Sequence, residues 1–235
     1  MLQQSDEWFA ARVGRVTASR VADVVARTKT GWGASRANYM AELIAERLTG
    51  VKADSYQSKA MEWGTEREPE ALALYAFMYN AEVVPAGFVP HPVIDMAGAS
   101  PDGLVGDDGL IEAKCPNTAT HIETLLGAPI DKKYLLQMLW QMACTQRRWC
   151  DFVSFDPRMP ADLQLHRQRV HYDDERVAEL ARDVIEFLRE LDAKVDALNK
   201  LRGLCEIPGS RNAAIHRVEL IDNEVQSIEL VGERT

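Results

Sequence analysis

The chain has 235 residues, of which 46% are hydrophobic, and this size and composition favour one sizeable folded domain. Its formal net charge of −9 argues against a dedicated DNA-binding module, which would be basic. No apolar run is long enough to span a membrane and no cleavable signal pattern is present, so we expect a cytoplasmic protein without a membrane partner. Four cysteines without a CxxC pair and five scattered histidines argue against a zinc site.

The charges are unevenly distributed. The C-terminal third carries the surplus acid, whereas the segment from Trp8 to Asn38 contains a single acid, Asp23. A basic segment can bind phosphate while an acidic exterior faces solvent. The basic residues of this N-terminal segment are Arg12, Arg15, Arg20, Arg27, Lys29 and Arg36.

The N-terminal region is expected to be helical. Ser5 is a suitable N-cap for a helix that runs through Arg15. Thr17 or Ser19 would cap a second helix over residues 20–26, where a phosphate would meet free backbone N–H groups and the positive end of the helix dipole. Simple capping would also account for both hydroxyl residues.

Two longer helices are expected next. After a polar, mobile loop over residues 28–34, Ser35 would cap a helix that ends at Gly50. The second helix covers residues 58–79, and Pro69 would kink it or start a new turn. Core positions are expected at Leu72, Leu74, Tyr75 and Met78, and a solvated acidic face at Glu62, Glu66, Glu68 and Glu70.

The middle of the chain is expected to form a sheet. A helix over residues 132–144 would follow it, and the polar Gln137 on that helix could be a satisfied core amide. A long amphipathic helix over residues 173–201 would pack within the subunit or at an oligomer contact. Strands are expected at residues 82–89, 96–99, 103–105 and 110–115, with outer strands at 150–155 and 163–172.

The hairpin over residues 103–115 carries the most informative residues. Glu112 and Lys114 are two positions apart in a strand and therefore project on the same side of the sheet. The glycine-rich turn between the two strands brings Asp102 back across from Glu112. Two converging carboxylates suit a hard divalent cation such as magnesium, and a nearby lysine can hold a water against a phosphorus atom. The pattern indicates metal-assisted phosphodiester hydrolysis.

A structural interpretation of the same residues competes with this one. Pro-Asp-Gly is a common turn sequence, and a strand with alternating charges is usually a solvated face. However, Leu110 and Ile111 make this strand too apolar for an exposed edge, so Glu112 and Lys114 in its continuation would need partners or a metal.

The Pro101-Asp102 and Glu112-Ala113-Lys114 elements resemble the lambda exonuclease, or YqaJ-like viral recombinase, family of the PD-(D/E)xK nuclease superfamily. The resemblance spans residues 5–198, most of the chain. It implies an α/β fold with a central mixed β-sheet flanked by helices, a restriction-endonuclease-like core, over residues 1–201. The resemblance does not extend to residues 202–235, a C-terminal extension in which the runs over residues 215–221 and 225–231 predict a β-hairpin. Further matching residues are Trp8, Arg12, Gly14, Thr17-Ala18-Ser19, Trp63-Gly64, Glu68, Tyr134, Gln137, Met142 and Phe155-Asp156-Pro157-Arg158-Met159.

The resemblance also implies an activity. Members of the family are magnesium-dependent 5′-to-3′ exonucleases of double-stranded DNA that form homotrimer rings and pass the remaining 3′ strand to an annealing protein. The expected partners are therefore duplex ends with a 5′-phosphate, and the expected setting is phage-type recombination in a bacterial or phage-infected cell. The alternatives are a structure-selective endonuclease on the same fold and a non-catalytic DNA-end-binding protein.

Roles for individual residues follow from the resemblance. Asp102 would be a shared ligand of two magnesium ions, which manganese can replace, with Glu112, the Ala113 carbonyl and Glu68 completing the ligand set. Lys114 would position and activate the attacking water, with Gln137 holding the lysine or the water in place. A second glutamine of the family corresponds to Leu139 here. The DNA contacts would be Arg12, Thr17 and Ser19 on the 5′-phosphate, Lys29 nearby, and Met61 as an apolar wedge between the strands.

Overall fold

The computed structural model describes residues 3–53 and 58–204. Residues 1–195 form one compact unit, and residues 196–235 form a second unit, of which only the end of the last helix is described. The β-hairpin expected in residues 202–235 lies outside the described residues. Within the described residues, no helix is both long and apolar enough to cross a membrane.

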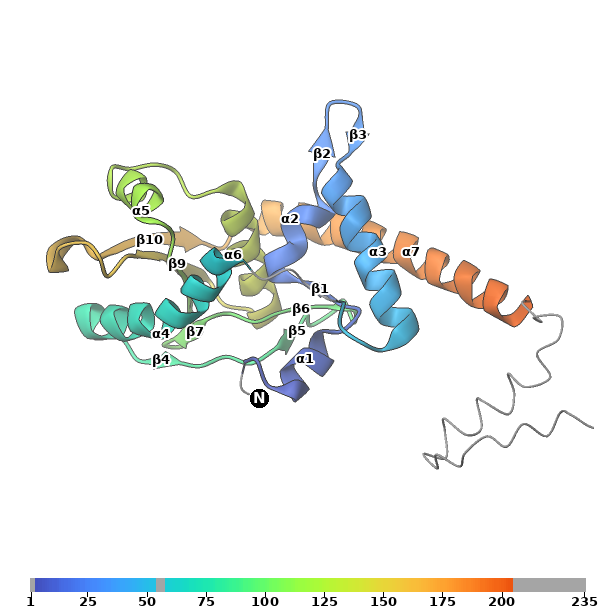
Figure 1. The fold of residues 1–235 in the computed structure, drawn as a ribbon, viewed down its shortest axis with the longest axis horizontal. Coiled ribbons are helices and arrows are strands. Elements are labelled where there is room, and N and C mark those ends of the chain that lie inside the picture. The colour runs from blue at the N-terminus through green and yellow to red at the C-terminus, as the bar shows by residue number, and fades with distance from the viewer. Residues whose placement is uncertain (1–2, 54–57, 205–235) are drawn as a thin grey trace, which may run out of the picture. The chain divides into compact units, whose positions relative to one another are not determined.

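A five-stranded mixed sheet forms the centre of the first unit (Figure 1). The strand order is β10-β9-β8-β7-β4. Strand β8 is parallel to β9, whereas the other neighbours are antiparallel. This arrangement confirms the predicted central mixed sheet, in which the hairpin over residues 103–115 supplies two inner strands, β7 and β8. The strands are β4 (Val83–Val84), β7 (Gly103–Val105), β8 (Gly109–Lys114), β9 (Trp149–Phe155) and β10 (Leu165–His171).

A second, three-stranded sheet differs from the prediction of one mid-chain sheet. Its order is β1-β6-β5, with β1 (Val16–Thr17) parallel to β6 (Ala97–Ala99) and β5 (Val89–Pro90) antiparallel to it. The expected strand over residues 82–89 is therefore two strands in two sheets. Pro85 lies between them, and a proline cannot donate to a strand ladder.

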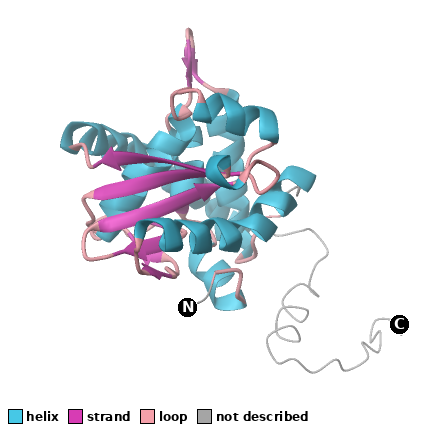
Figure 2. Cartoon of the chain, turned by 90° about the vertical axis from the view of Figure 1, so that its left-hand side faces the viewer, coloured by secondary structure: helices cyan, strands magenta, loops and turns pink. Residues whose placement is uncertain are grey.

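Two helices cover opposite faces of the five-stranded sheet, and Figure 2 shows helices packed beside its strands. Helix α4 (Lys59–Tyr79) packs Ala71 and Tyr75 against the face that carries Ile111. Helix α6 (Lys132–Thr145) packs Met138 and Leu139 against the face that carries Leu110. Because side chains alternate along β8, the α6 face is also the face of Glu112.

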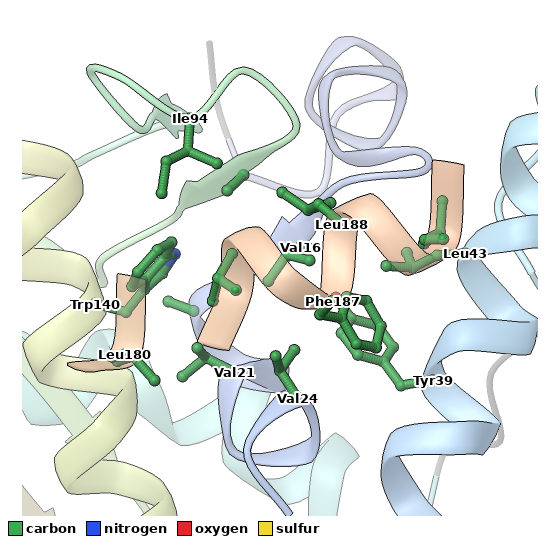
Figure 3. Packing of buried hydrophobic residues seen from close by; sticks show 14 of the residues in the cluster. Val16, Val21, Val24, Tyr39, Leu43, Ile94, Trp140, Leu180, Phe187 and Leu188 are labelled. Carbon is green, nitrogen blue, oxygen red and sulfur yellow. The ribbon is translucent and has the colours of Figure 1, made fainter. Parts of the chain in front are cut away.

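A second core joins the N-terminal segment to the last helix, α7 (Asp174–Leu204) (Figure 3). Val21 and Val24 of α2 (Val21–Val24) and Tyr39 and Leu43 of α3 (Ala34–Thr49) pack around Phe187 of α7, and Tyr39 stacks on Phe187. The predicted apolar stripe of α7 is confirmed as packing up to Leu191. Leu198, nearer the end of this helix, is 37% exposed.

Several local predictions are wrong for identifiable reasons. Ser5 caps α1 (Asp6–Arg12) as expected, but the helix ends before Gly14, whose φ of +68° is incompatible with a continuing helix. The expected loop over residues 28–34 contains a short hairpin of β2 (Arg27–Thr28) and β3 (Gly31–Trp32). Ser35 is not a cap, because α3 already begins at Ala34.

Helices α4 and α5 add two further differences. Helix α4 continues through Pro69 without interruption, and Met78, expected in the core, is 48% exposed. Sequence patterns did not predict α5 (Thr118–Leu125), although Asn117 caps it through its side chain. The described chain also contains two short 3₁₀ turns, at Ala18–Arg20 and Ala161–Leu163.

The contact between β8 and β9 leads to a stability prediction. A Cβ on Gly109 would lie 2.0 Å from the Trp149 ring, so Gly109→Ala should lower the free energy of unfolding by about 1–3 kcal/mol. Gly64→Ala is the matched control, because nothing lies within 4 Å of its Cβ position inside helix α4 and alanine favours helix. Urea unfolding measures both; equal effects would contradict the close approach of β8 and β9.

Candidate active site

The end of strand β8 carries a buried carboxylate with three partners. Glu112 is 0% exposed. Its Oε1 accepts a hydrogen bond from Gln137 Nε2 (2.6 Å), and its Oε2 accepts one from Gln141 Nε2 (2.5 Å). Lys114 forms an ion pair with Oε1 from two positions along the strand. A charge at the end of an apolar strand is thereby compensated by two amides and one ammonium group.

Asp102 lies across the hairpin from Glu112. The β7–β8 register pairs Gly103 with Ile111, so the residue before Gly103 lies next to the residue after Ile111. Asp102 Oδ2 accepts a hydrogen bond from the Ala113 backbone N–H at 2.8 Å. The predicted convergence of Asp102, Glu112 and Lys114 is therefore present in the structure.

The electrostatics of this cluster are dominated by negative charge. Burial and then the charge of Glu112 raise the pKa of Asp102 well above its usual value. The same two causes, in the same order, raise the pKa of Glu68 on helix α4. Burial alone would lower the pKa of Lys114, but the charges of Glu112 and Asp102 raise it. Three carboxyl groups thus share one ammonium group, and the cluster favours an additional cation.

The donor set fits a hard cation. Carboxylate oxygens and a backbone carbonyl are the ligands that magnesium prefers, and Asp102, Glu112, Glu68 and the Ala113 carbonyl supply these types. Within the described residues, no three His, Cys, Asp or Glu side chains form a preassembled metal cluster. Both Glu112 oxygens are engaged by Gln137, Gln141 and Lys114. The metal-ligand roles therefore stay predictions.

Two glutamines of helix α6 donate to Glu112, whereas Gln137 was predicted to hold Lys114 or the attacking water; the contact with water stays a prediction. Gln137 contacts Glu112 and not Lys114. Leu139, at the position of the family's second glutamine, is core, only 1% exposed. The second amide comes instead from Gln141, one helical turn beyond Gln137 and on the same helix face. This i, i+4 spacing is a sequence signal that could have identified Gln141. The same helix places the Tyr134 ring centroid 5.2 Å from Lys114 Nζ.

Arg12 is connected to the carboxylate cluster through Ser100. Its Nη1 donates to Ser100 Oγ (3.0 Å), which also accepts from Trp8 Nε1 (2.9 Å), and the guanidinium lies 4.1 Å from the centroid of the Trp8 ring. Burial lowers the pKa of Arg12. Ser100 precedes Pro101-Asp102 in the chain, so this predicted phosphate-binding residue lies beside the segment that carries Asp102.

Thr17 is the last residue of β1, and Ser19 lies in the 3₁₀ turn that follows it. Their hydroxyl oxygens are 3.4 Å apart, Thr17 is buried and Ser19 is exposed. Neither caps the following helix as predicted, because Thr17 makes no side-chain cap bond to the 3₁₀ turn and Arg20 occupies the N-cap position of α2. Their proposed phosphate contacts stay predictions.

Three of the six basic residues of the N-terminal segment form ion pairs with acidic side chains. Arg20 binds Asp23 and Glu42, and two further arginines bind acidic residues of α7: Arg27 to Asp183 and Arg36 to Glu190. Arg15 donates to the Asp95 carbonyl. Within the described residues, the ion pairs include neither Arg12 nor Lys29. Arg15 takes part in none of these ion pairs either, so within the described residues Arg12, Arg15 and Lys29 are the basic residues of this segment without an acidic partner.

Lys29 and Met61 lie on the surface. Lys29 is exposed between β2 and β3, in the hairpin labelled at the top of Figure 1. Met61 is 55% exposed in the first turn of α4, which Ser58 caps. Among the contacts of the described residues, none joins either residue to the carboxylate cluster, so the structure does not bring these two together with Asp102.

The Asp156-Pro157-Arg158 motif anchors the chain beside the active site. Arg158 donates to both oxygens of the buried Asp156 (2.7 and 2.9 Å) and to the Pro116 carbonyl just beyond β8 (3.2 Å). Its guanidinium also lies 4.7 Å from the centroid of Trp63 on α4. The motif thus links β9, the end of β8 and the helix that carries Glu68.

This anchor leads to a prediction about acid stability. Burial alone would raise the pKa of Asp156, but hydrogen bonds from Arg158 and Thr118 lower it to about 2. A depressed folded-state pKa gives stability that is present above the unfolded value of about 4 and is lost as the pH falls towards 2. Asp156→Asn should therefore be less stable than wild type at pH 6, and the difference should shrink between pH 4 and pH 2. Urea unfolding across this range measures it; a constant difference would contradict the assignment.

Comparison with known proteins places these observations in a family. The YqaJ-like viral recombinase domain matches residues 7–148. The alkaline exonuclease LHK-Exo from Laribacter hongkongensis is 52% identical, with a TM-score of 0.78 over 85% of this chain and 98% of that one. Its complex with dAMP matches at 53% identity and the same TM-score over the same shares of the two chains.

A more distant structure supports the fold alone. The phage related exonuclease from Haemophilus somnus 129PT has a TM-score of 0.65 at 16% identity, covering 78% of this chain and 96% of that one. Comparison with curated proteins gives no match. The domain match covers more than half of the chain, and it includes Arg12 and the Asp102–Lys114 hairpin. The chain therefore belongs to the YqaJ-like viral recombinase family.

Proposed function

We propose that this protein is a magnesium-dependent 5′-to-3′ exonuclease of double-stranded DNA that leaves 3′ single strands for phage-type recombination. The observation that carries the proposal is the cluster of Asp102, Glu112 and Lys114 at the end of β8, with Asp102 bonded to the Ala113 N–H. Membership of the family and similarity to an alkaline exonuclease support a nuclease. The metal requirement and the strand polarity are part of the proposal.

Asp102, Glu112, Glu68 and the Ala113 carbonyl would hold two magnesium ions, which manganese can replace. When bound, such ions lower the pKa of a coordinated water and neutralise the leaving oxygen of the phosphodiester. The residues of the chain contribute orientation and charge. Gln137 and Gln141 hold the Glu112 carboxylate, and the Lys114 ammonium group places positive charge beside the reacting phosphate, where negative charge develops.

DNA would be recognised through its terminus and backbone and not through its bases. Arg12, with its guanidinium on Ser100 next to the Asp102 segment, would contact a 5′-phosphate together with Thr17 and Ser19. Lys29 and Met61 would touch the duplex from the surface. A homotrimer ring and a single-strand annealing protein complete the proposed assembly, in a bacterial or phage-infected cell.

The role of Asp102 is tested by a matched pair of variants. Asp102→Asn should abolish magnesium-dependent digestion of linear duplex DNA, because the cation loses a shared carboxylate ligand, while binding to DNA ends persists. Asp107→Asn is the control, because it changes an exposed acid in the turn of the same hairpin. Gel assays of digestion and end binding measure both variants. Digestion by Asp102→Asn at the wild-type rate would refute the assignment.

Circular duplex DNA separates the proposed exonuclease from the alternatives. An exonuclease needs an end and should leave covalently closed circles intact, whereas a structure-selective endonuclease on this fold would nick them. A protein that binds ends without digesting linear DNA would instead be a non-catalytic end-binding protein.

The support of Glu112 by Gln141 gives a second kinetic prediction. Gln141→Met removes the hydrogen bond to Glu112 Oε2 at nearly constant volume and should reduce the digestion rate about 10- to 100-fold, the usual cost of losing a partner that orients a metal ligand. Gln168→Met, which changes an exposed residue of β10, is the control. If both variants digest DNA at the wild-type rate, Gln141 has no part in orienting Glu112.

A further inference from the structure

The turn between Arg12 and Thr17 is held by side chains from helix α3. The turn contains Gly14, in the left-handed region at φ +68°. Both polar backbone groups of Gly14 bind α3. Its N–H donates to Glu46 Oε2 at 2.7 Å, and its carbonyl accepts from Arg47 Nε at 2.9 Å. Glu46 and Arg47, which are consecutive in α3, thus hold the backbone N–H and the backbone carbonyl of Gly14.

Glu46 also connects this turn to the segment that precedes α4. Its Oε1 accepts a hydrogen bond from the Ala53 N–H at 3.0 Å, five residues before Ser58. Glu46 is 6% exposed, and within the described residues its carboxylate takes part in no ion pair. The two oxygens of this buried carboxylate therefore tie the Gly14 turn and the segment before α4 to the same point of α3.

The same carboxylate acts on Arg12. Burial lowers the pKa of Arg12, and the charges of Tyr39 and Glu46 oppose that shift. Arg47 in turn forms an ion pair with Asp192 of α7, so Glu46 and Arg47, here called the α3 clamp, also connect the turn to α7. A Cβ on Gly14 would lie 2.6 Å from Arg47 Cγ, which shows how closely the two elements fit.

We propose that Glu46 and Arg47 are positioning residues that hold the Gly14 turn, so that Arg12 on one side and Thr17 on the other face the same 5′-terminal phosphate. This inference rests on the phosphate contact of the proposed function and adds the residues that set its geometry. The preference for phosphorylated ends would thus depend on two residues of α3 that lie outside the carboxylate cluster.

Glu46→Gln tests the clamp with little change of shape. An amide offers one oxygen to two backbone N–H donors, so either Gly14 or Ala53 loses its acceptor. The measurement is the Kd for duplex ends that carry a 5′-phosphate or a 5′-hydroxyl, with calcium replacing magnesium so that cleavage does not interfere. The affinity for phosphate ends should fall about three- to tenfold, as expected for one lost hydrogen bond, while the affinity for hydroxyl ends stays unchanged.

Leu43→Val is the control for a purely structural effect. It alters a buried core residue on the same helix, so it should lower the thermal midpoint without changing the ratio of the two Kd values. Arg47→Met is the second variant and replaces Glu46→Gln if that protein does not fold. It keeps methylene groups near Gly14 and removes the Nε donor, so it should also lower the preference for phosphate ends.

The outcomes separate this inference from the function on which it rests. If Glu46→Gln, or Arg47→Met in its place, weakens both kinds of end equally or leaves the ratio unchanged, the clamp does not position the phosphate contact. If the wild-type protein binds both ends equally, the phosphate contact itself fails and the role of the clamp fails with it. The comparison of Asp102→Asn with Asp107→Asn would still decide the nuclease assignment in that case.

Discussion

The structure depends on a carboxylate buried at the end of an apolar strand. Leu110 and Ile111 are fully buried in β8, and Glu112 continues that strand at 0% exposure. A buried charge of this kind is tolerated only when donors surround it. Gln137 and Gln141 supply two of these donors from α6. The orientation of Glu112 therefore depends on how α6 packs on the sheet. The mixed sheet is thus both the core and the support of the site.

The acidic net charge is compatible with a nucleic-acid substrate once the ion pairs are considered. Acidic residues of α3 and α7 neutralise the arginines that would otherwise form a broad basic surface, as Arg20 with Glu42 and Arg36 with Glu190 illustrate. Among the basic residues of the N-terminal segment, this arrangement leaves Arg12, Arg15 and Lys29 without an acidic partner in the described part of the chain, and Arg12 lies beside the Asp102 segment. Positive charge confined to a few positions favours binding at a DNA end, because a uniformly basic surface would bind duplex DNA anywhere along its length.

The sequence predicted those parts of the site that depend on local periodicity. Alternation along a strand places Glu112 and Lys114 on one face, and a short turn fixes Asp102 opposite, so this triad was accessible without tertiary information.

The split of the sheets at Pro85 was not predicted, because a local apolar run does not show which neighbour a strand pairs with. Gln141 was missed although it lies one helical turn beyond Gln137, because the sequence alone does not show that this face of the helix meets Glu112. The cap assigned to Thr17 failed because its hydroxyl faces Ser19.

The account is tested most directly by following a linear duplex labelled separately at the 5′ and 3′ ends of one strand, with and without magnesium. The account predicts that, with magnesium, the 5′ label is released early as small products while the 3′-labelled strand shortens progressively from its 5′ side, and that chelation stops both changes. Early release of the 3′ label, internal cuts that do not depend on an end, or digestion that continues after chelation would contradict it.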